Sequence, residues 1–279
     1  MENWICATCG VQYAASEQPP AHCPICEDQR QYVGYQGQQW TTLDGMRQAG
    51  YHNAITQEEP GLTGIVTEPS FAIGQRALLV QTDQGNVLWD CVSLLDDATA
   101  QAVDDLGGIA AIAASHPHLY GSVITWAERF QAKVYLHEAD RRWMMRPDDG
   151  DDRVTFWSGE SLALPGDLTL VRLGGHFPGS AVLHWPAGAE GKGALLTGDT
   201  IYVVSDRAWV SFMYSYPNLI PLPAPKIRHI RDIIAPYRFD RLYAGFAGRV
   251  VSTDASAAVQ RSAERYLKAI ADGLEGDEP

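Results

Sequence analysis

The sequence predicts an α/β protein: one large domain in which strands and helices alternate, preceded by a small four-cysteine module. From about residue 61 onward, apolar runs of strand length alternate with segments of helical spacing. Residues 1–35, in contrast, hold four of the five cysteines and show no clear periodicity. A chain of 279 residues is long enough for one large domain and one small module.

The large domain is expected to open with a β-hairpin, in which Arg76–Thr82 and Asn86–Val92 flank a glycine-containing turn. The continuous apolar run Ile109–Ala114 predicts a strand that is buried on both faces. Further strands are expected at Lys133–Leu136, Leu168–Leu173, Ala181–Trp185, Ala194–Thr197 and Arg241–Tyr243. Helices are expected at Asp96–Leu106, Ser122–Gln131 and Pro225–Ile234, with a last one after the N-cap candidates Ser252, Thr253 and Asp254.

These patterns divide the chain into three segments. Residues 1–35 form the four-cysteine module, residues 36–60 read as a linker with one short helix near Thr42–Ala49, and residues 61–279 form the large domain. The module is too small to hold a core without help, so a metal is expected to supply its folding energy. We therefore expect loss of the module to spare the large domain.

Charge and hydropathy exclude several partners. The net charge of −13 disfavours nucleic acid, because such a surface repels phosphate backbones. No apolar stretch approaches the roughly 18–20 residues that span a bilayer. Met1–Trp4 shows no signal-peptide pattern, so we expect a cytoplasmic protein with reduced cysteines. A small-molecule substrate is the expected partner, and the sequence leaves a homo-oligomer open.

The cysteines have the spacing of a metal site. Cys6 and Cys9 form one C-x2-C pair, Cys23 and Cys26 form a second, and thirteen residues lie between the two pairs. Each pair can aim two thiolates at one ion, so two pairs complete a tetrahedron. The pattern predicts a structural zinc site, and it leaves open a rubredoxin-like iron, which uses the same ligands.

Three histidines and an aspartate follow predicted strands. His116 and His118 come after Ile109–Ala114, His176 after Leu168–Leu173, and Asp199 after Ala194–Thr197. The carboxyl ends of strands in an α/β sheet are where such folds place their chemistry. Three imidazoles and a carboxylate suit Zn, Fe or Mn.

These segments resemble the metallo-β-lactamase superfamily, in its glyoxalase II-like branch, over about Leu62–Ala271. The resemblance implies an αβ/βα sandwich of two mixed sheets with outer helices and with metals at one edge. The family pattern H-x-H-x-D-H matches its first two histidines to His116 and His118. His176 then matches the third histidine, and Asp199 matches the aspartate that usually bridges two metals.

Three positions depart from the family pattern. Tyr120 and Gly121 stand where the family has Asp and His, and Phe246 stands near the place of its late histidine. In the family, all three missing groups serve the second metal. The resemblance therefore implies one Zn or Fe ion, held by the three histidines and Asp199.

The favoured activity is metal-dependent hydrolysis of an ester, thioester or lactone-like small molecule. Asp199 is expected to act as a fourth ligand or to deprotonate water, and Tyr120 either donates to a substrate oxyanion or packs over the metal pocket. Two alternatives stay open. One is a mononuclear non-haem iron dioxygenase that uses His116, His176 and Asp199. The other is an inactive protein of the same fold that binds or senses a ligand.

The insert Ser205–Pro223 is rich in aromatic residues. It is expected to form a pocket wall for an apolar or aromatic substrate, with Arg207 as an anchor for an anionic group. The alternative is that it packs onto the core or forms a dimer interface. The expected substrate-binding residues of this insert are Arg207, Trp209, Phe212, Tyr214 and Tyr216.

Overall fold

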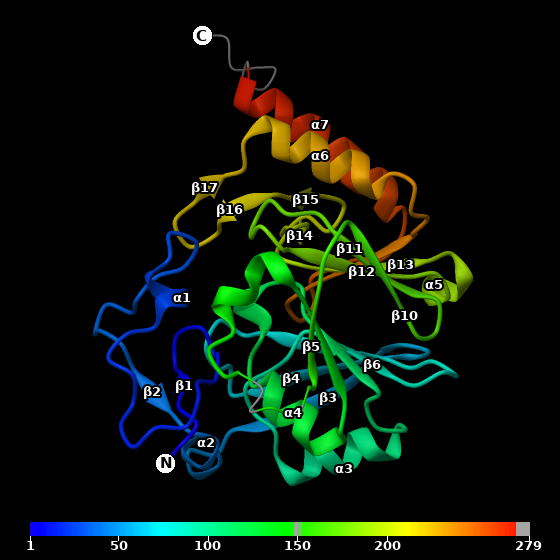
Figure 1. The fold of residues 1–279 in the computed structure, drawn as a ribbon. Coiled ribbons are helices and arrows are strands. Elements are labelled where there is room, and N and C mark those ends of the chain that lie inside the picture. Colours follow the sequence, from blue (N-terminus) through cyan, green and yellow to red (C-terminus); the bar gives the residue numbers. More distant parts are fainter. Residues whose placement is uncertain (148–149, 151, 272–279) are drawn as a thin grey trace.

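The computed structural model describes residues 1–147, 150 and 152–271, and two mixed β-sheets lie face to face at its centre (Figure 1). Helices α3 (Asp97–Asp105) and α4 (Val123–Phe130) cover the outer face of the first sheet. Helices α6 (Ala224–Ile234) and α7 (Ala255–Ala271) cover the second. Apolar side chains of both sheets fill the space between them. This is the αβ/βα sandwich that the sequence predicted.

The first sheet has seven strands, in the order β3-β4-β5-β6-β7-β8-β9. Its first half is antiparallel, and β6 to β9 are parallel. The predicted hairpin joins β5 to β6, and β7 is the strand expected to be buried on both faces. The strands are β3 (His52–Glu59), β4 (Leu62–Glu68), β5 (Arg76–Val80), β6 (Val87–Trp89), β7 (Ala111–Ala113), β8 (Lys133–His137) and β9 (Val154–Trp157).

The second sheet has six strands, in the order β10-β11-β12-β13-β18-β19. Strands β11 and β13 are both antiparallel to β12, so their carboxyl ends lie at the same edge of the sheet. His176 and Asp199 follow these two ends. The strands are β10 (Ser161–Leu164), β11 (Leu168–Arg172), β12 (Ala181–Trp185), β13 (Ala194–Gly198), β18 (Arg241–Ala244) and β19 (Val250–Val251).

Shorter elements complete the described chain. Two pairs of short strands, β14 with β15 and β16 with β17, form the insert between β13 and α6. The remaining elements are β1 (Ile5–Cys6), α1 (Pro24–Glu27), β2 (Trp40–Thr41), α2 (Leu43–Gln48), two 3-10 turns (Pro117–Leu119 and Glu138–Trp143), α5 (Gly188–Gly191), β14 (Tyr202–Val203), β15 (Val210–Ser211), β16 (Met213–Ser215) and β17 (Ile220–Pro221). Among the described residues, no helix combines the length and the apolar character that crossing a bilayer requires.

The segment expected as a linker is part of the fold. Helix α2 lies where a short helix was predicted, but residues 52–59 form β3, which pairs antiparallel with β4, with a register shift between Gln57 and Glu59. As the edge strand, β3 is mostly exposed or half-buried and has a polar sequence. Edge strands carry polar residues that discourage further pairing, so β3 lacks the apolar run by which strands are recognised.

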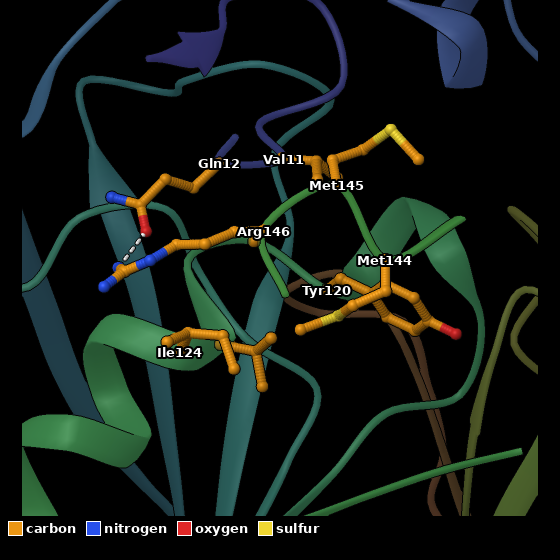
Figure 2. Close-up of a pocket in the computed structure, with 9 residues that line it drawn as sticks. Val11, Gln12, Tyr120, Ile124, Met144, Met145 and Arg146 are labelled. Atoms are coloured by element: carbon orange, nitrogen blue, oxygen red, sulfur yellow. Dashed lines mark hydrogen bonds between the residues drawn. The ribbon is translucent and has the colours of Figure 1, made fainter. Parts of the chain in front are cut away.

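The four-cysteine module packs against the large domain instead of standing apart. Val11, Tyr13 and Ile25 belong to the same apolar cluster as the outer face of the first sheet and α4. The backbone amide of Gln12 donates to Gly121 O at 3.0 Å. Figure 2 shows a small cavity at this contact, where Arg146 donates to the Gln12 side chain at 2.7 Å. The module and the large domain therefore share one core.

Candidate metal centre

The four module cysteines bring their sulfur atoms together. All four Sγ atoms lie within 4.8 Å of one another, with Cys6 and Cys26 at 3.5 Å and Cys9 and Cys23 at 3.7 Å. A tetrahedral ion with bonds of ~2.3 Å to thiolates places its sulfurs ~3.8 Å apart, so the cluster fits such an ion. Two further contacts suit thiolates: Tyr13 donates its hydroxyl proton to Cys23 Sγ at 3.0 Å, and Gln38 Nε2 donates to Cys6 Sγ at 3.1 Å.

The second cluster, called here the histidine centre, consists of His116, His118, His176 and Asp199, whose ligand atoms also lie within 4.8 Å of one another. All four side chains are buried. Gly198 permits this convergence. With φ at +54°, a Cβ there would lie 2.2 Å from Ser115 Oγ, so a larger residue would push the end of β13 away from the segment after β7.

Interatomic distances in the histidine centre match one shared ion. His118 Nδ1 and His176 Nε2 are 3.3 Å apart, and His116 Nε2 and Asp199 Oδ2 are 3.5 Å apart. Bonds of ~2.0–2.1 Å around a tetrahedral ion place neighbouring nitrogens ~3.3 Å apart. Among the described residues, buried His116 Nε2 and Asp199 Oδ1 have no hydrogen-bond partner. Buried polar atoms are seldom left unpaired in proteins, so this arrangement fits a bound metal.

The protonation states of the centre suit ligands. Burial lowers the pKa of His176 to about 3 and that of His118 well below its usual value, so both imidazoles are neutral at pH 7. Burial alone raises the pKa of Asp199, but the nearby His116 reverses this and lowers that pKa below its ordinary value. Neutral imidazoles and an ionised carboxylate are the forms that bind metal ions.

Outer contacts fix the orientation of these ligands. Nδ1 of His116 lies 2.9 Å from Ser115 Oγ, and Nδ1 of His176 lies 3.2 Å from Met213 O, which leaves each Nε2 free for a metal. The hydroxyl of Tyr216 donates to Asp199 O at 2.9 Å. Gln75 Nε2 donates both to Cys9 O at 2.6 Å and to His118 O at 3.1 Å, so one amide joins the backbones of the two clusters.

Three of the positions at which the family has ligands for a second metal are occupied here by other residues. Gly121 has φ at +51°, and a Cβ there would lie 2.7 Å from Cys91 O, so this backbone has no room for a histidine. Phe246 lines the cavity of the histidine centre beside Asp199 and Tyr202. The described residues thus provide Asp199 but none of the other three groups of the family's second-metal site.

Tyr120 does not reach the histidine centre. It is buried and lines the cavity between the module and the large domain, next to Val11 and Met144 (Figure 2). The 3-10 turn Pro117–Leu119 is the reason, because residues two apart on such a turn project in different directions. Of the two expectations for Tyr120, a hydrogen bond to a substrate oxyanion is therefore not supported, and its ring packs in the core instead.

The aromatic insert contributes less to the site than expected. Tyr216 lines the cavity of the histidine centre, and Tyr214 lines a neighbouring cavity. The other three expected substrate-binding residues lie elsewhere. Phe212 is buried against α7, Trp209 packs against Arg261 and Arg265 of α7, and Arg207 is exposed and donates to Val204 O. The side chains of Trp209 and Phe212 are directed toward α7 and not toward the metal centre.

Arg30 is a site residue that the sequence did not reveal. It follows α1 of the module, yet its Nε donates to His176 O, and its guanidinium lies 4.5 Å from the ring centre of Phe177 and 4.4 Å from that of Tyr214. It lines the cavity of the histidine centre together with Gln31. No local pattern marks Arg30, because its partners are more than 140 residues away along the chain.

Asp140 is a second residue of the site that the sequence did not reveal. It holds the loop that carries His176. Its Oδ1 accepts from Gly179 N at 3.0 Å, while Oδ2 has no hydrogen-bond partner among the described residues, and burial raises the pKa of this carboxyl to about 6. The folded protein therefore binds this proton more tightly than the unfolded chain does. The contribution of Asp140 to the free energy of unfolding should fall as pH rises from about 4 to about 6 and stay level above that range.

Asp140→Asn should remove this pH dependence. The difference in the free energy of unfolding, variant minus wild type, should increase by up to ~3 kcal/mol from pH 4 to pH 7. The wild type loses stability over this range because its buried carboxyl ionises, whereas an asparagine at this position does not titrate. Urea unfolding at both pH values measures the change, with exposed Asp83→Asn as the control. An equal difference between variant and wild type at both pH values would show that folding does not raise the pKa of Asp140.

Similarity to known proteins shows the family to which the chain belongs. The family model of the metallo-beta-lactamase superfamily matches residues 72–256, and the chain belongs to this superfamily. In sequence, the chain is 55% identical over 271 residues to a Bacillus subtilis (strain 168) protein named "Uncharacterized protein YmaE", with 97% of each chain covered.

Solved structures share the fold at low sequence identity. The crystal structure of VMB-1 has a TM-score of 0.58 and 15% identity, and the match covers 79% of this chain and 99% of that one. The DIM-1 metallo-beta-lactamase also gives a TM-score of 0.58 at 15% identity, with 78% of this chain and 98% of that one covered. At this identity the likeness concerns the fold alone.

Proposed function

We propose that this protein is a metal-dependent hydrolase with a mononuclear site, which uses zinc and acts on an ester, thioester or lactone-like small molecule. The observation that carries this proposal is the histidine centre, whose four ligands converge and of which His118, His176 and Asp199 line a cavity of about 110 Å³. A bound Zn²⁺ supplies a Lewis acid that polarises a carbonyl and lowers the pKa of water toward ~7. The four thiolates of the module suit zinc as well as a rubredoxin-like iron, and zinc is proposed as its structural metal.

The residues of the chain supply the remaining functions. The lowered pKa of Asp199 favours its ionised form, and one carboxylate oxygen can bind the metal while the other accepts a proton from an attacking water. Tyr216 holds the backbone of Asp199, and the rings of Tyr202 and Phe246 line the cavity. Arg30 provides a positive charge at the cavity where negative charge develops on the substrate.

The two alternatives have less support. A facial triad of His116, His176 and Asp199 would leave His118 without a function, yet its Nδ1 lies 3.3 Å from His176 Nε2, as expected for ligands of one ion. An inactive protein would have no need of a complete ligand set beside a cavity. Oxygen uptake by iron-loaded protein with a persulfide would support the dioxygenase instead.

Activity of purified protein on 4-nitrophenyl esters, acyl thioesters and lactones tests the proposal, together with metal analysis. We expect about two metal ions per chain, one in each cluster. Asp199→Asn should lower kcat/KM by about 10²–10⁴-fold, while exposed Asp206→Asn should leave it unchanged. Three metal ions per chain, or equal activity of Asp199→Asn and wild type, would contradict a mononuclear hydrolase.

A further inference from the structure

A second cavity, of about 320 Å³, lies beside the histidine centre and shares Arg30 with it. It opens between the module, the end of β11 and the start of α6. Gly174 and Gly175 line it, and they directly precede His176 in the chain. We call it the basic cavity, after the side chains in its lining that can carry positive charge: Arg30, Arg172, Lys226 and His229.

The charge of this lining is unusual for the protein. The chain has a net charge of −13, yet none of the described residues that line the basic cavity is acidic. The first turn of α6 also borders the cavity at Pro223 and Lys226, and the amino-terminal end of a helix carries a partial positive charge. Asp28 already offsets the charge of Arg30, but the other cationic groups of the cavity repel one another, so an anion there lowers their energy.

Two of the guanidinium groups are already held in place. Arg30 is mostly buried, with its guanidinium against the rings of Phe177 and Tyr214 and with Nη1 2.7 Å from Asp28 Oδ1. Arg172 donates from Nε to Pro178 O at 2.9 Å. Both side chains therefore lose little conformational freedom when an anion binds, which favours affinity.

We propose that the basic cavity binds an anionic, oxygen-rich group of the substrate, a carboxylate or a phosphate, while the acyl carbon of the same molecule reaches the histidine centre. That the anionic group belongs to a substrate rests on the proposed hydrolase function, whereas anion binding in the basic cavity does not depend on it. Arg30 lines both cavities, so one molecule with an anionic end and an ester or thioester can occupy both. The anchor expected at Arg207 is thus replaced by groups from the module, β11 and α6.

Calorimetric titration with inorganic phosphate and with succinate tests the anion site, and it distinguishes the two chemistries. The double variant Arg172→Ala/Lys226→Ala removes two charged side chains from the cavity. Its Kd for the preferred anion should be about tenfold higher than that of wild type. The matched control Arg129→Ala/Lys192→Ala removes the same charges from surface ion pairs elsewhere and should leave the Kd unchanged. His118→Ala should retain anion binding, because it disturbs only the histidine centre.

Kinetics test whether the same site recognises substrate. The ratio of kcat/KM for mono-4-nitrophenyl succinate to that for 4-nitrophenyl butyrate should fall about tenfold in Arg172→Ala/Lys226→Ala and stay constant in the control. Absence of binding by either anion, an equal loss in the control variant, or loss of binding in His118→Ala would overturn the anion site. Anion binding with the expected variant pattern but without hydrolysis would uphold the site and refute the hydrolase.

Discussion

Cys23→Ser should destabilise the whole chain, not the module alone. The variant loses one of four thiolates, and with it the folding energy that the metal supplies. Because the module shares an apolar cluster with the first sheet, its unfolding would expose that face and release Arg30 from His176 O. We expect the free energy of unfolding to fall by more than about 4 kcal/mol, in a single transition. Thermal unfolding followed by tryptophan fluorescence measures this, together with metal content.

Cys91→Ser is the matched control for this experiment. Cys91 is a buried thiol like Cys23, but it lies outside the four-cysteine cluster. Its variant should retain both metals and lose only ~1–2 kcal/mol, the cost of burying a hydroxyl group. If hydrogen exchange in Cys23→Ser accelerated in residues 1–35 only, the module would be an independent unit, as the sequence alone led us to expect.

His118→Ala should empty the histidine centre and leave the four-cysteine cluster loaded. Metal content should fall from about two ions to about one per chain, because the remaining ligands bind too weakly to retain the ion during purification. Hydrolysis should fall by at least ~10³-fold, because the histidine centre would no longer hold the metal ion that acts as the Lewis acid. The contact from Gln75 to the backbone of His118 survives the substitution, so the module should stay docked.

His184→Ala controls for the loss of a buried imidazole. His184 lies on β12, and its Nε2 contacts Arg238 O at 2.8 Å, away from both clusters. Its variant should retain both metals and full activity, even if it unfolds at a lower temperature. A His118→Ala protein that still held two ions would show that His118 is not a ligand.

Local patterns predicted most of the fold. The run at Ile109–Ala114 became β7, and the glycine-containing turn became the hairpin between β5 and β6, because burial and turn chemistry act on neighbouring residues. The four cysteines and the histidine centre could also be predicted, since each ligand stands beside a pattern of its own. What such patterns cannot contain is the identity of the bound metal.

The parts that were missed depend on distant contacts. β3 has no apolar alternation because it is an exposed edge, so only its pairing with β4 identifies it. Arg30 became a site residue through its contacts with His176 and Phe177, which the chain brings close only after the module docks. Trp209 and Phe212 were assigned to the site from composition, but composition does not say which side of β15 and β16 faces the metal edge.

The turn at Gly121 has a consequence for how this kind of protein diverged. The carbonyl of this residue accepts the backbone amide of Gln12, and the same left-handed turn excludes any side chain where the superfamily has a second-metal histidine. The backbone conformation that docks the module is thus the same one that leaves no room for a second-metal histidine. Homologues that dock the four-cysteine module in this way should therefore carry glycine at this position.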